Sequence, residues 1–120
     1  MVLGESGEMY LETLLILSKK NENVRSNDLA VSMGFSRPSV CRAVKILKTE
    51  QYISVDEKGY LTLTNSGREI AEKIYERHNV ISAFFRSIGV SAETAAEDAC
   101  RIEHVISDES FEKLKEHYGE

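Results

Sequence analysis

The chain has 120 residues, of which 42% are apolar, and a formal net charge of −5 at pH 7. This length fits one compact domain or two small ones sharing a core, and the unbiased composition indicates a globular protein rather than a fibrous or disordered one. The longest apolar run, residues 80–85, is far shorter than the roughly 20 residues of a membrane span, and no signal peptide opens the chain. The two thiols, Cys41 and Cys100, fall in separate predicted helices, which favours a reducing cytoplasm over a disulfide.

The first predicted elements are two helices, and a tight turn follows the second. Apolar residues recur with helical spacing over residues 8–20, which predicts an amphipathic helix. Ser26 can cap a second, short helix over residues 27–33, and Gly34 supplies the left-handed residue that would stop it.

A third helix and a β-hairpin follow the turn. Ser36 is a natural N-cap for a helix over residues 37–51, and Pro38 sits in its first turn, where a missing N–H costs little. Residues 52–55 and 60–63 then alternate and are rich in β-formers, with a charged, glycine-containing turn between them. The order is therefore helix, helix, helix, hairpin.

The second half of the chain predicts three more helices, over residues 65–88, 91–106 and 108–119, each preceded or opened by a Ser, Thr, Asn or Asp cap. The expected fold is mainly α. We expect one domain over residues 1–64 with a two-stranded wing, and a helical domain over residues 65–120.

Charge is distributed unevenly along the chain. Residues 1–63 carry eight basic and eight acidic side chains, for a net charge of zero, whereas residues 64–120 carry seven and twelve, for a net charge of −5. Residues 36–48 contain four basic side chains and no acidic one. The overall acidity argues weakly against a nucleic-acid partner, so only this segment is a candidate for binding one.

The order of elements in the first half is that of a winged helix-turn-helix, in which the third helix enters the major groove of duplex DNA. Residues near the start of that helix can reach base edges, and arginine can contact guanine with two hydrogen bonds. Basic residues farther along the helix and at the hairpin tip would contact phosphates instead. The candidate DNA-binding residues are Ser36, Arg37, Pro38, Ser39, Arg42, Lys45, Lys48 and Lys58. The alternatives are a solvated helix face or a winged helix used for protein contacts.

A second candidate site is the set Cys100, Glu103 and His104, spaced i, i+3 and i+4, which on one helix would share a face. With Met9 added, the donors are sulfur, nitrogen and oxygen, which suit a first-row ion such as Fe²⁺, Co²⁺, Ni²⁺ or Zn²⁺. Each residue alone has a plainer explanation, since Met9 often fills cores and Cys100 often packs as a small apolar residue.

Two further residues, Glu12 and His78, could build a second, adjacent metal position. A lone histidine on a helix is more often solvated or hydrogen-bonded than a metal ligand. His78 is therefore a candidate ligand only if the other donors lie beside it. Convergence in space is what would distinguish a metal centre from ordinary side chains.

The residues resemble the DtxR/MntR family of metal-dependent transcriptional repressors. The resemblance is carried by residues 8–12 (EMYLE), 28–30 (DLA), 63–67 (LTNSG), 77–78 (RH) and 98–109 (DACRIEHVISDE). It implies a homodimer whose winged helices bind a palindromic DNA operator, whose C-terminal helices form the dimer interface, and whose corepressor is a metal ion. The regulated genes would be those of metal uptake.

The resemblance also implies a choice of metal. Met9, Cys100, Glu103 and His104 match the site of the iron-responsive branch, whereas the manganese branch has acidic residues at the first two positions. We therefore expect Fe²⁺ as the physiological metal, with Mn²⁺, Co²⁺, Ni²⁺ or Zn²⁺ able to substitute.

The second site of the iron branch is only half matched. His78 is kept, but a glutamate is replaced by Ser82 and a histidine by Ala96, while Glu12 looks like a ligand of the manganese branch. The SH3-like third domain of many iron-branch members is missing, which implies the shorter two-domain layout or a truncation after Glu120.

Three other functions compete with this interpretation. A Mn²⁺-responsive repressor would belong to the same family, and a metal-independent winged-helix regulator could sense oxidation through Cys100. A metallohydrolase has little support, because the sequence contains no HExxH motif, nucleophile elbow or phosphate-binding glycine loop. We expect neither an enzyme nor a small-molecule substrate, and no membrane partner.

Overall fold

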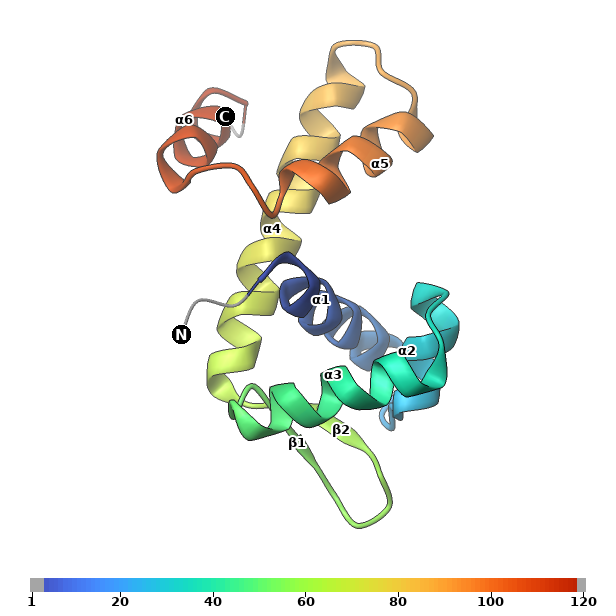
Figure 1. The fold of residues 1–120 in the computed structure, drawn as a ribbon. Coiled ribbons are helices and arrows are strands. Elements are labelled where there is room, and N and C mark those ends of the chain that lie inside the picture. The colour runs from blue at the N-terminus through green and yellow to red at the C-terminus, as the bar shows by residue number, and fades with distance from the viewer. Residues whose placement is uncertain (1–3, 119–120) are drawn as a thin grey trace. The chain divides into compact units, whose positions relative to one another are not determined.

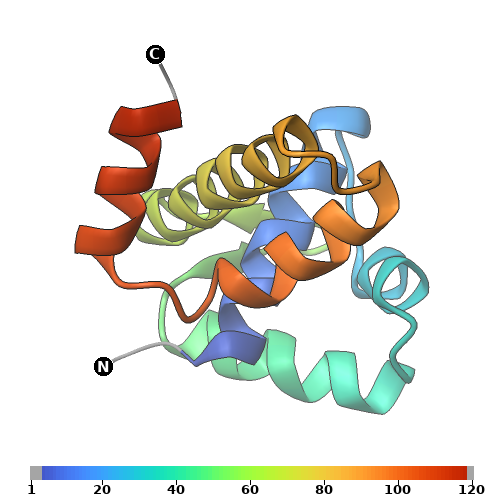
Figure 2. The same ribbon diagram turned by 90° about the horizontal axis from the view of Figure 1, so that it is seen from above.

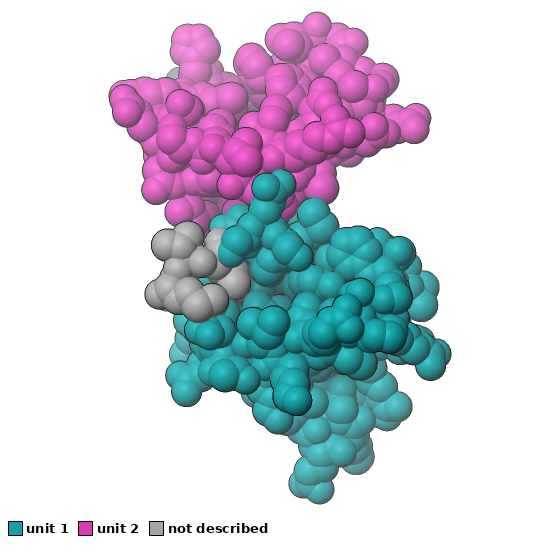
Figure 3. Space-filling view, in the orientation of Figure 1, with its two compact units in different colours: residues 1–72 teal, residues 73–120 magenta. Residues whose placement is uncertain are grey.

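The computed structural model describes residues 4–118, which form six helices and a two-stranded sheet (Figures 1 and 2). In chain order these are α1 (Glu5–Lys20), α2 (Ser26–Met33), α3 (Arg37–Thr49), β1 (Ile53–Val55), β2 (Leu61–Leu63), α4 (Asn65–Ser87), α5 (Ala92–Ile102) and α6 (Asp108–Tyr118). They divide into two compact units, residues 1–72 and 73–120 (Figure 3). None of the described helices is both long enough and apolar enough to cross a lipid bilayer.

The core of the first unit lies between α1, α2, α3 and the hairpin. Apolar residues at helical spacing point inward from α1 and α3, and alternate residues of the strands cover them. The buried side chains include Leu11, Leu14, Leu15, Val40, Val44, Leu47, Ile53 and Leu61. The mainly helical fold with a two-stranded wing is thus as the sequence predicts.

The cap of α2 differs from the prediction. Ser26 is the first helical residue, and Arg25 occupies the cap position, where its N–H donates to the Asp28 carboxylate at 2.8 Å. This is the N3 half of a capping box, in which the side chain of the third helical residue accepts from the N–H of the cap residue, so the Ser26 hydroxyl is not the cap. Gly34 stops the helix with φ +70°, as predicted.

The start of α3 is as predicted: Ser36 is the N-cap, and its Oγ accepts from the Ser39 N–H at 3.3 Å. The helix ends at Thr49, two residues before the predicted end, because Gln51 adopts a left-handed conformation with φ +66°. Figure 1 shows the hairpin extending beyond α3 as a wing. Its strands pair antiparallel, with Ile53 opposite Leu63, and each is one residue shorter than predicted.

The connection from the wing into α4 is tightly packed. The Gln51 carbonyl accepts hydrogen bonds from Thr64 Oγ1 at 2.7 Å and Ser66 Oγ at 3.2 Å. Gly67 lies against the Tyr52 backbone so closely that a Cβ at this position would be 2.0 Å from the Tyr52 carbonyl oxygen. Only glycine, which has no Cβ, fits at position 67.

The second unit packs the C-terminal part of α4 with α5 and α6 around Ile81, Ala99 and Phe111. Helix α6 begins after Ser107, whose Oγ accepts from the Ser110 N–H at 3.1 Å. Its predicted end near Gly119 lies outside the described residues. Helix α4 ends at Ser87, one residue before the predicted end.

Helix α5 ends four residues before the predicted end, and this changes the geometry of the candidate metal site. The buried guanidinium of Arg77 donates to the carbonyl oxygens of Glu103 at 3.3 Å and Ile106 at 2.8 Å. These bonds take up carbonyls that a continuing helix would have used. The predicted single helix therefore does not run through all three candidate ligands: Cys100 lies within α5, Glu103 is its C-cap, with its N–H bonded to the Ala99 carbonyl, and His104 follows in the turn.

Candidate metal centre and nucleic-acid interface

The turn after α5 holds two of the predicted metal ligands. Glu103 is the C-cap residue of the helix, with φ −57° and ψ −27°, and His104 follows in the turn. Arg77 fixes this turn from α4 through its two carbonyl contacts and through an ion pair with Asp108. These contacts fix the backbone of the turn that carries Glu103 and His104.

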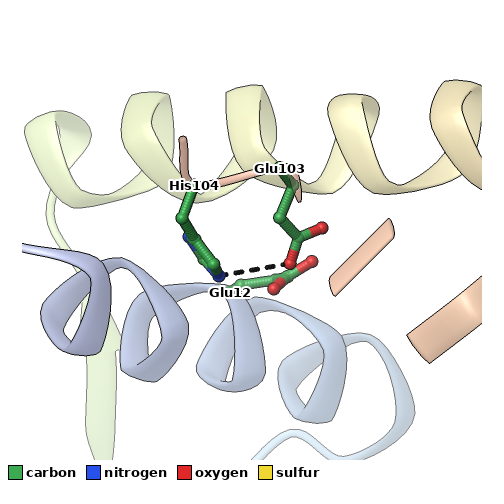
Figure 4. A group of neighbouring side chains, drawn as sticks. All are labelled: Glu12, Glu103 and His104. Atoms are coloured by element: carbon green, nitrogen blue, oxygen red, sulfur yellow. Dashed lines mark ion pairs between the residues drawn. The ribbon is translucent and has the colours of Figure 1, made fainter. Parts of the chain in front are cut away.

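The carboxylate of Glu103 lies between two imidazoles. Its Oε2 is 3.1 Å from Nδ1 of His78 on α4, and its Oε1 is 3.3 Å from Nε2 of His104, the ion pair drawn in Figure 4. The side chains of Glu103 and His104 have no exposed surface, whereas that of His78 is 27% exposed. The second unit therefore brings three of the predicted ligands together.

This arrangement fits a divalent metal ion. The Glu103 Oε1 and His104 Nε2 atoms face each other at 3.3 Å in the interior of the second unit. A buried carboxylate is costly unless a charge or hydrogen bond compensates it. One carboxylate with an imidazole at each oxygen supplies the oxygen and nitrogen donors that a first-row ion prefers, and it could bridge two positions.

The remaining predicted ligands lie on two other helices. Cys100 is half-buried on α5, one turn before Glu103. Met9 and Glu12 lie three residues apart on α1, in the first unit, and Glu12 is also labelled in Figure 4. Helical spacing puts these two on one face of α1, where Met9 is half-buried and Glu12 is 7% exposed.

The candidate DNA-binding residues lie on the outer side of α3. Val40, Val44 and Leu47 point into the core, and the basic residues of the helix lie exposed on the part of its surface outside this buried stripe. These are Arg37, Arg42, Lys45 and Lys48, with Ser36, Pro38 and Ser39 at the start of the helix. A single surface of the first unit thus carries all the helix candidates.

Side-chain hydrogen bonds restrain both arginines near the start of α3. Arg42 donates from Nη2 to Ser39 Oγ at 3.4 Å, and Ser39 in turn contacts Ser36 Oγ at 2.9 Å. Arg37 donates from Nε to Oδ1 of Asn27 on α2 at 2.9 Å.

The tip of the wing presents Lys58 in a defined turn. The Asp56 carboxylate accepts from the backbone N–H groups of Lys58 and Tyr60, both at 2.9 Å, and Gly59 adopts φ +84°. The side chain of Lys58 is exposed. Within the same turn, the Tyr60 ring lies beside Arg25, whose guanidinium is 4.7 Å from the centre of the ring.

Sequence reasoning missed three residues that organise these surfaces: Arg25, Asn27 and Arg77. Their partners lie 35, 10 and 26 or more residues away along the chain. No local spacing signals such contacts. The one available hint was the adjacency of Arg77 to His78, which the resemblance includes without a role.

Comparison with known proteins matches the first part of the chain to a DNA binding domain and the second part to a metal binding domain. Residues 2–61 match the iron dependent repressor N-terminal DNA binding domain, and residues 64–120 match the iron dependent repressor metal binding and dimerisation domain. An HTH-type transcriptional regulator of Methanocaldococcus jannaschii is 33% identical over 115 residues, covering 94% of this chain and 92% of the relative. The regulator MntR of Geobacillus kaustophilus is 31% identical over 109 residues, covering 91% and 77%.

Solved structures give the same result. The manganese regulator SloR superposes with a TM-score of 0.84 at 28% identity, covering 99% of this chain and 55% of that chain. IdeR of T. acidophilum gives a TM-score of 0.81 at 26% identity, covering 100% and 55%. The present chain spans about half the length of these two regulators. The chain belongs to the DtxR/MntR family of metal-dependent transcriptional repressors.

Proposed function

We propose that this protein is a cytoplasmic, Fe²⁺-activated repressor that binds a palindromic operator as a homodimer and reduces the expression of metal-uptake genes. Residues 1–64 would form the DNA-binding domain, and residues 65–120 the metal-binding and dimerisation domain. The observation that carries the metal part of this proposal is the buried Glu103 carboxylate between the imidazoles of His78 and His104.

The proposed ligand set combines donors of both domains. Met9, Cys100, Glu103 and His104 would hold the activating ion, with Glu12 and His78 completing a second position. The bound ion would supply coordination bonds that join α1 to the turn after α5. The residues themselves contribute the selectivity, because each donor atom prefers a particular class of metal.

Iron is favoured over manganese by the two sulfur donors, Met9 and Cys100. Thioether and thiolate ligands prefer softer ions, whereas Mn²⁺ prefers carboxylate and carbonyl oxygen. A Mn²⁺-responsive repressor is the second candidate, since relatives include the manganese regulator SloR and several regulators named MntR. Glu12, an oxygen donor on α1, is the residue that supports this alternative.

The proposed DNA surface is the exposed face of α3 together with the wing. Ser36, Arg37, Pro38, Ser39 and Arg42 would lie at base edges or beside them, while Lys45, Lys48 and Lys58 would contact phosphates. Phosphate contacts release counterions, so affinity should fall steeply with salt concentration. The segment's lack of acidic side chains supports this assignment.

Dimerisation is proposed to use the helices of the second unit. Two large apolar side chains of this unit are mostly exposed, Ile88 at 63% and Val105 at 69%, and the Tyr118 ring packs edge-on against Phe84 at the surface. A dimer interface on this unit would cover these side chains and remove their apolar surface from water. A symmetric dimer would present two copies of α3 to two operator half-sites, spaced about one duplex turn or a multiple of it.

The test is operator binding titrated with Fe²⁺ and with Mn²⁺ under anaerobic, reducing conditions. We expect both ions to tighten binding, with Fe²⁺ acting at lower concentration. The double variant Met9→Asp/Cys100→Glu replaces soft donors by hard ones and should shift the preference toward Mn²⁺. Cys41→Ser removes the other thiol but no proposed ligand, so its metal preference should stay unchanged.

Three results would count against the proposal. Binding that ignored both ions but responded to oxidant would support a redox regulator acting through Cys100 instead. An unchanged metal preference in the double variant would remove the argument from donor softness. A wild-type protein that responded to Mn²⁺ at lower concentration than Fe²⁺ would favour the manganese alternative.

A further inference from the structure

The guanidinium of Arg37 is anchored through its Nε atom. Arg37 is the first residue of α3, and its Nε donates to Oδ1 of Asn27, in the first turn of α2, at 2.9 Å. Side chains in a helix lean toward its N-terminus, so a side chain at the first position extends back beyond the helix start, toward α2. The Ser36 cap fixes where the helix begins, and hence where Arg37 starts.

This contact decides which donors of Arg37 remain available. A guanidinium has five N–H groups in a planar fork, one on Nε and two on each terminal nitrogen. It can meet a planar pair of acceptors side-on, through Nε and one terminal nitrogen, or end-on, through both terminal nitrogens. With Nε committed to Asn27, the end-on approach is the one left to Arg37.

Arg42 is restrained differently. Its Nη2, a terminal nitrogen that the end-on approach requires, already donates to Ser39 Oγ at 3.4 Å. Because Nη2 carries two N–H groups, this bond takes up one of them and leaves the other. A terminal nitrogen of Arg42 is thus shared with its own helix, whereas Arg37 bonds to Asn27 through Nε and not through a terminal nitrogen.

We propose that Asn27 is a positioning residue that holds Arg37 for an end-on, two-hydrogen-bond contact with O6 and N7 of guanine in the major groove. Arg37 then sets guanine preference, while Arg42 contributes affinity without sequence preference. This inference rests on the proposed DNA-binding function of α3. Asn27 itself makes no base contact in this scheme, and it acts only through Arg37.

The surroundings of the pair support a positioning role. Asn27 and Arg37 line a recess of about 380 Å³ between α2 and α3, which Arg25 and Cys41 also line. Both side chains are exposed on the protein alone. An exposed hydrogen bond of this kind adds little to folding stability. Its value would lie in reducing the freedom of a long side chain before DNA binds.

The experiment begins with duplexes selected from a random-sequence library by the full-length wild-type protein with Mn²⁺. Affinities are then measured for the selected duplex, for single-base replacements of each guanine, and for duplexes carrying 7-deazaguanine, which lacks the N7 acceptor. At one guanine per half-site, wild-type protein should lose about 5- to 150-fold in affinity on replacement, the range for a good two-bond contact.

The variants distinguish the positioning of Arg37 by Asn27 from a general effect on DNA affinity. Arg37→Ala should abolish the preference for that guanine and the response to 7-deazaguanine, and Asn27→Ala should reduce both several-fold. In an Arg37→Ala background, Asn27→Ala should have no further effect on guanine preference. The matched control Arg42→Ala should weaken binding to all duplexes while leaving the guanine preference intact.

Full guanine preference in Asn27→Ala would overturn the inference while leaving metal-dependent DNA binding in place. An equal effect of Asn27→Ala with and without Arg37 would also overturn it, because Asn27 would then act on its own. A guanine preference lost in Arg42→Ala but kept in Arg37→Ala would assign the contact to Arg42 instead. Wild-type protein that selected no duplex would overturn both this inference and the proposed function.

Discussion

At the scale of single residues, Glu103 concentrates the chemistry of the second unit. Its backbone carbonyl accepts from Arg77, its Oε2 lies 3.1 Å from His78, and its Oε1 lies 3.3 Å from His104. The side chain has no exposed surface. A buried carboxylate in such a position is a poor choice for stability alone, because burying a charge costs several kcal/mol unless it is well compensated. Metal binding would provide that compensation.

Glu103→Gln tests this at near-constant shape. Removal of a direct ligand should weaken Mn²⁺ binding by more than about 10-fold, the lower end of losses seen when only supporting residues are changed. The metal-free variant should be as stable as wild type or more stable, because the buried charge is gone. Isothermal titration gives the affinity, and thermal unfolding without metal gives the stability.

Glu97→Gln is the matched control, since Glu97 is exposed on the same helix, α5. It should change neither quantity appreciably. Unaltered Mn²⁺ affinity in Glu103→Gln would remove Glu103 from the ligand set and leave its burial unexplained.

At the scale of elements, the entry into α4 depends on one close backbone approach. A Cβ on Gly67 would lie 2.0 Å from the carbonyl oxygen of Tyr52, far inside van der Waals contact. Because the neighbour is backbone, no side-chain rotation can relieve the overlap. The wing and α4 would have to move apart.

Gly67→Ala should therefore destabilise the protein by about 2 kcal/mol or more, at the upper part of the range for overpacked sites. The measurement is urea unfolding followed by circular dichroism. The control is Gly4→Ala, where an added Cβ meets nothing within 4 Å and the expected cost is below about 1 kcal/mol. Equal stability of the two variants would show that the backbone at Tyr52 yields easily.

The link between α5 and α6 is held by charge. Asp108, the first residue of α6, pairs with Lys73 at 3.0 Å and also with Arg77, both on α4. The hydrogen bond and charge of Lys73, followed by the charge of Arg77, hold the pKa of the Asp108 carboxyl below its usual value of 3.8. A lowered pKa means that folding favours the ionised form.

The sign of the pH dependence follows from this shift. The stabilisation by Asp108 should be fully present above about pH 4, its range in the unfolded chain, and should disappear as the pH falls through the lower folded pKa. Wild type should thus be more stable than Asp108→Asn at pH 7, and the difference should shrink as the pH falls and disappear below the folded pKa of Asp108. Urea unfolding across this pH range measures the difference.

The control for Asp108→Asn is Glu109→Gln, which also removes an acidic side chain from the first turn of α6 but makes no described ion pair with α4. Its effect would report the helix dipole alone. A pH-dependent loss of the same size in both variants would mean that Lys73 and Arg77 are not responsible.

At the scale of the whole molecule, the proposed function is a linkage between two binding events. If metal favours the arrangement of the domains that binds DNA, operator DNA must favour metal binding by the same factor. The typical coupling of about 1 to 3 kcal/mol corresponds to a change of roughly 5- to 150-fold in each affinity.

The reciprocal measurement tests this linkage. Operator affinity is determined with and without saturating Mn²⁺, and Mn²⁺ affinity is determined with and without saturating operator. The two ratios should agree within error. Metal that bound equally well with and without operator would show that it does not act as a corepressor, whatever its effect on stability.

The amino-acid sequence alone determined the order of elements and the chemical types of the candidate ligands. Apolar periodicity, the Ser36 cap, Gly34 and the alternating strands are local signals, and the structure bears out the mainly helical fold with its wing. The family was also readable, because residues 98–109 form a long, specific motif. Fe²⁺ as the metal, and the ligand and DNA-contact assignments, stay predictions.

Only the tertiary structure decided how those residues are presented. It ends α5 at Ile102, so that Glu103 is the C-cap and His104 lies in the following turn, and this turn is bonded to a guanidinium 26 residues earlier in the chain. It likewise pairs Asn27 with Arg37 across the turn between α2 and α3. Helical spacing describes neighbours along one element, whereas these contacts depend on how separate elements pack, which no short window of sequence contains.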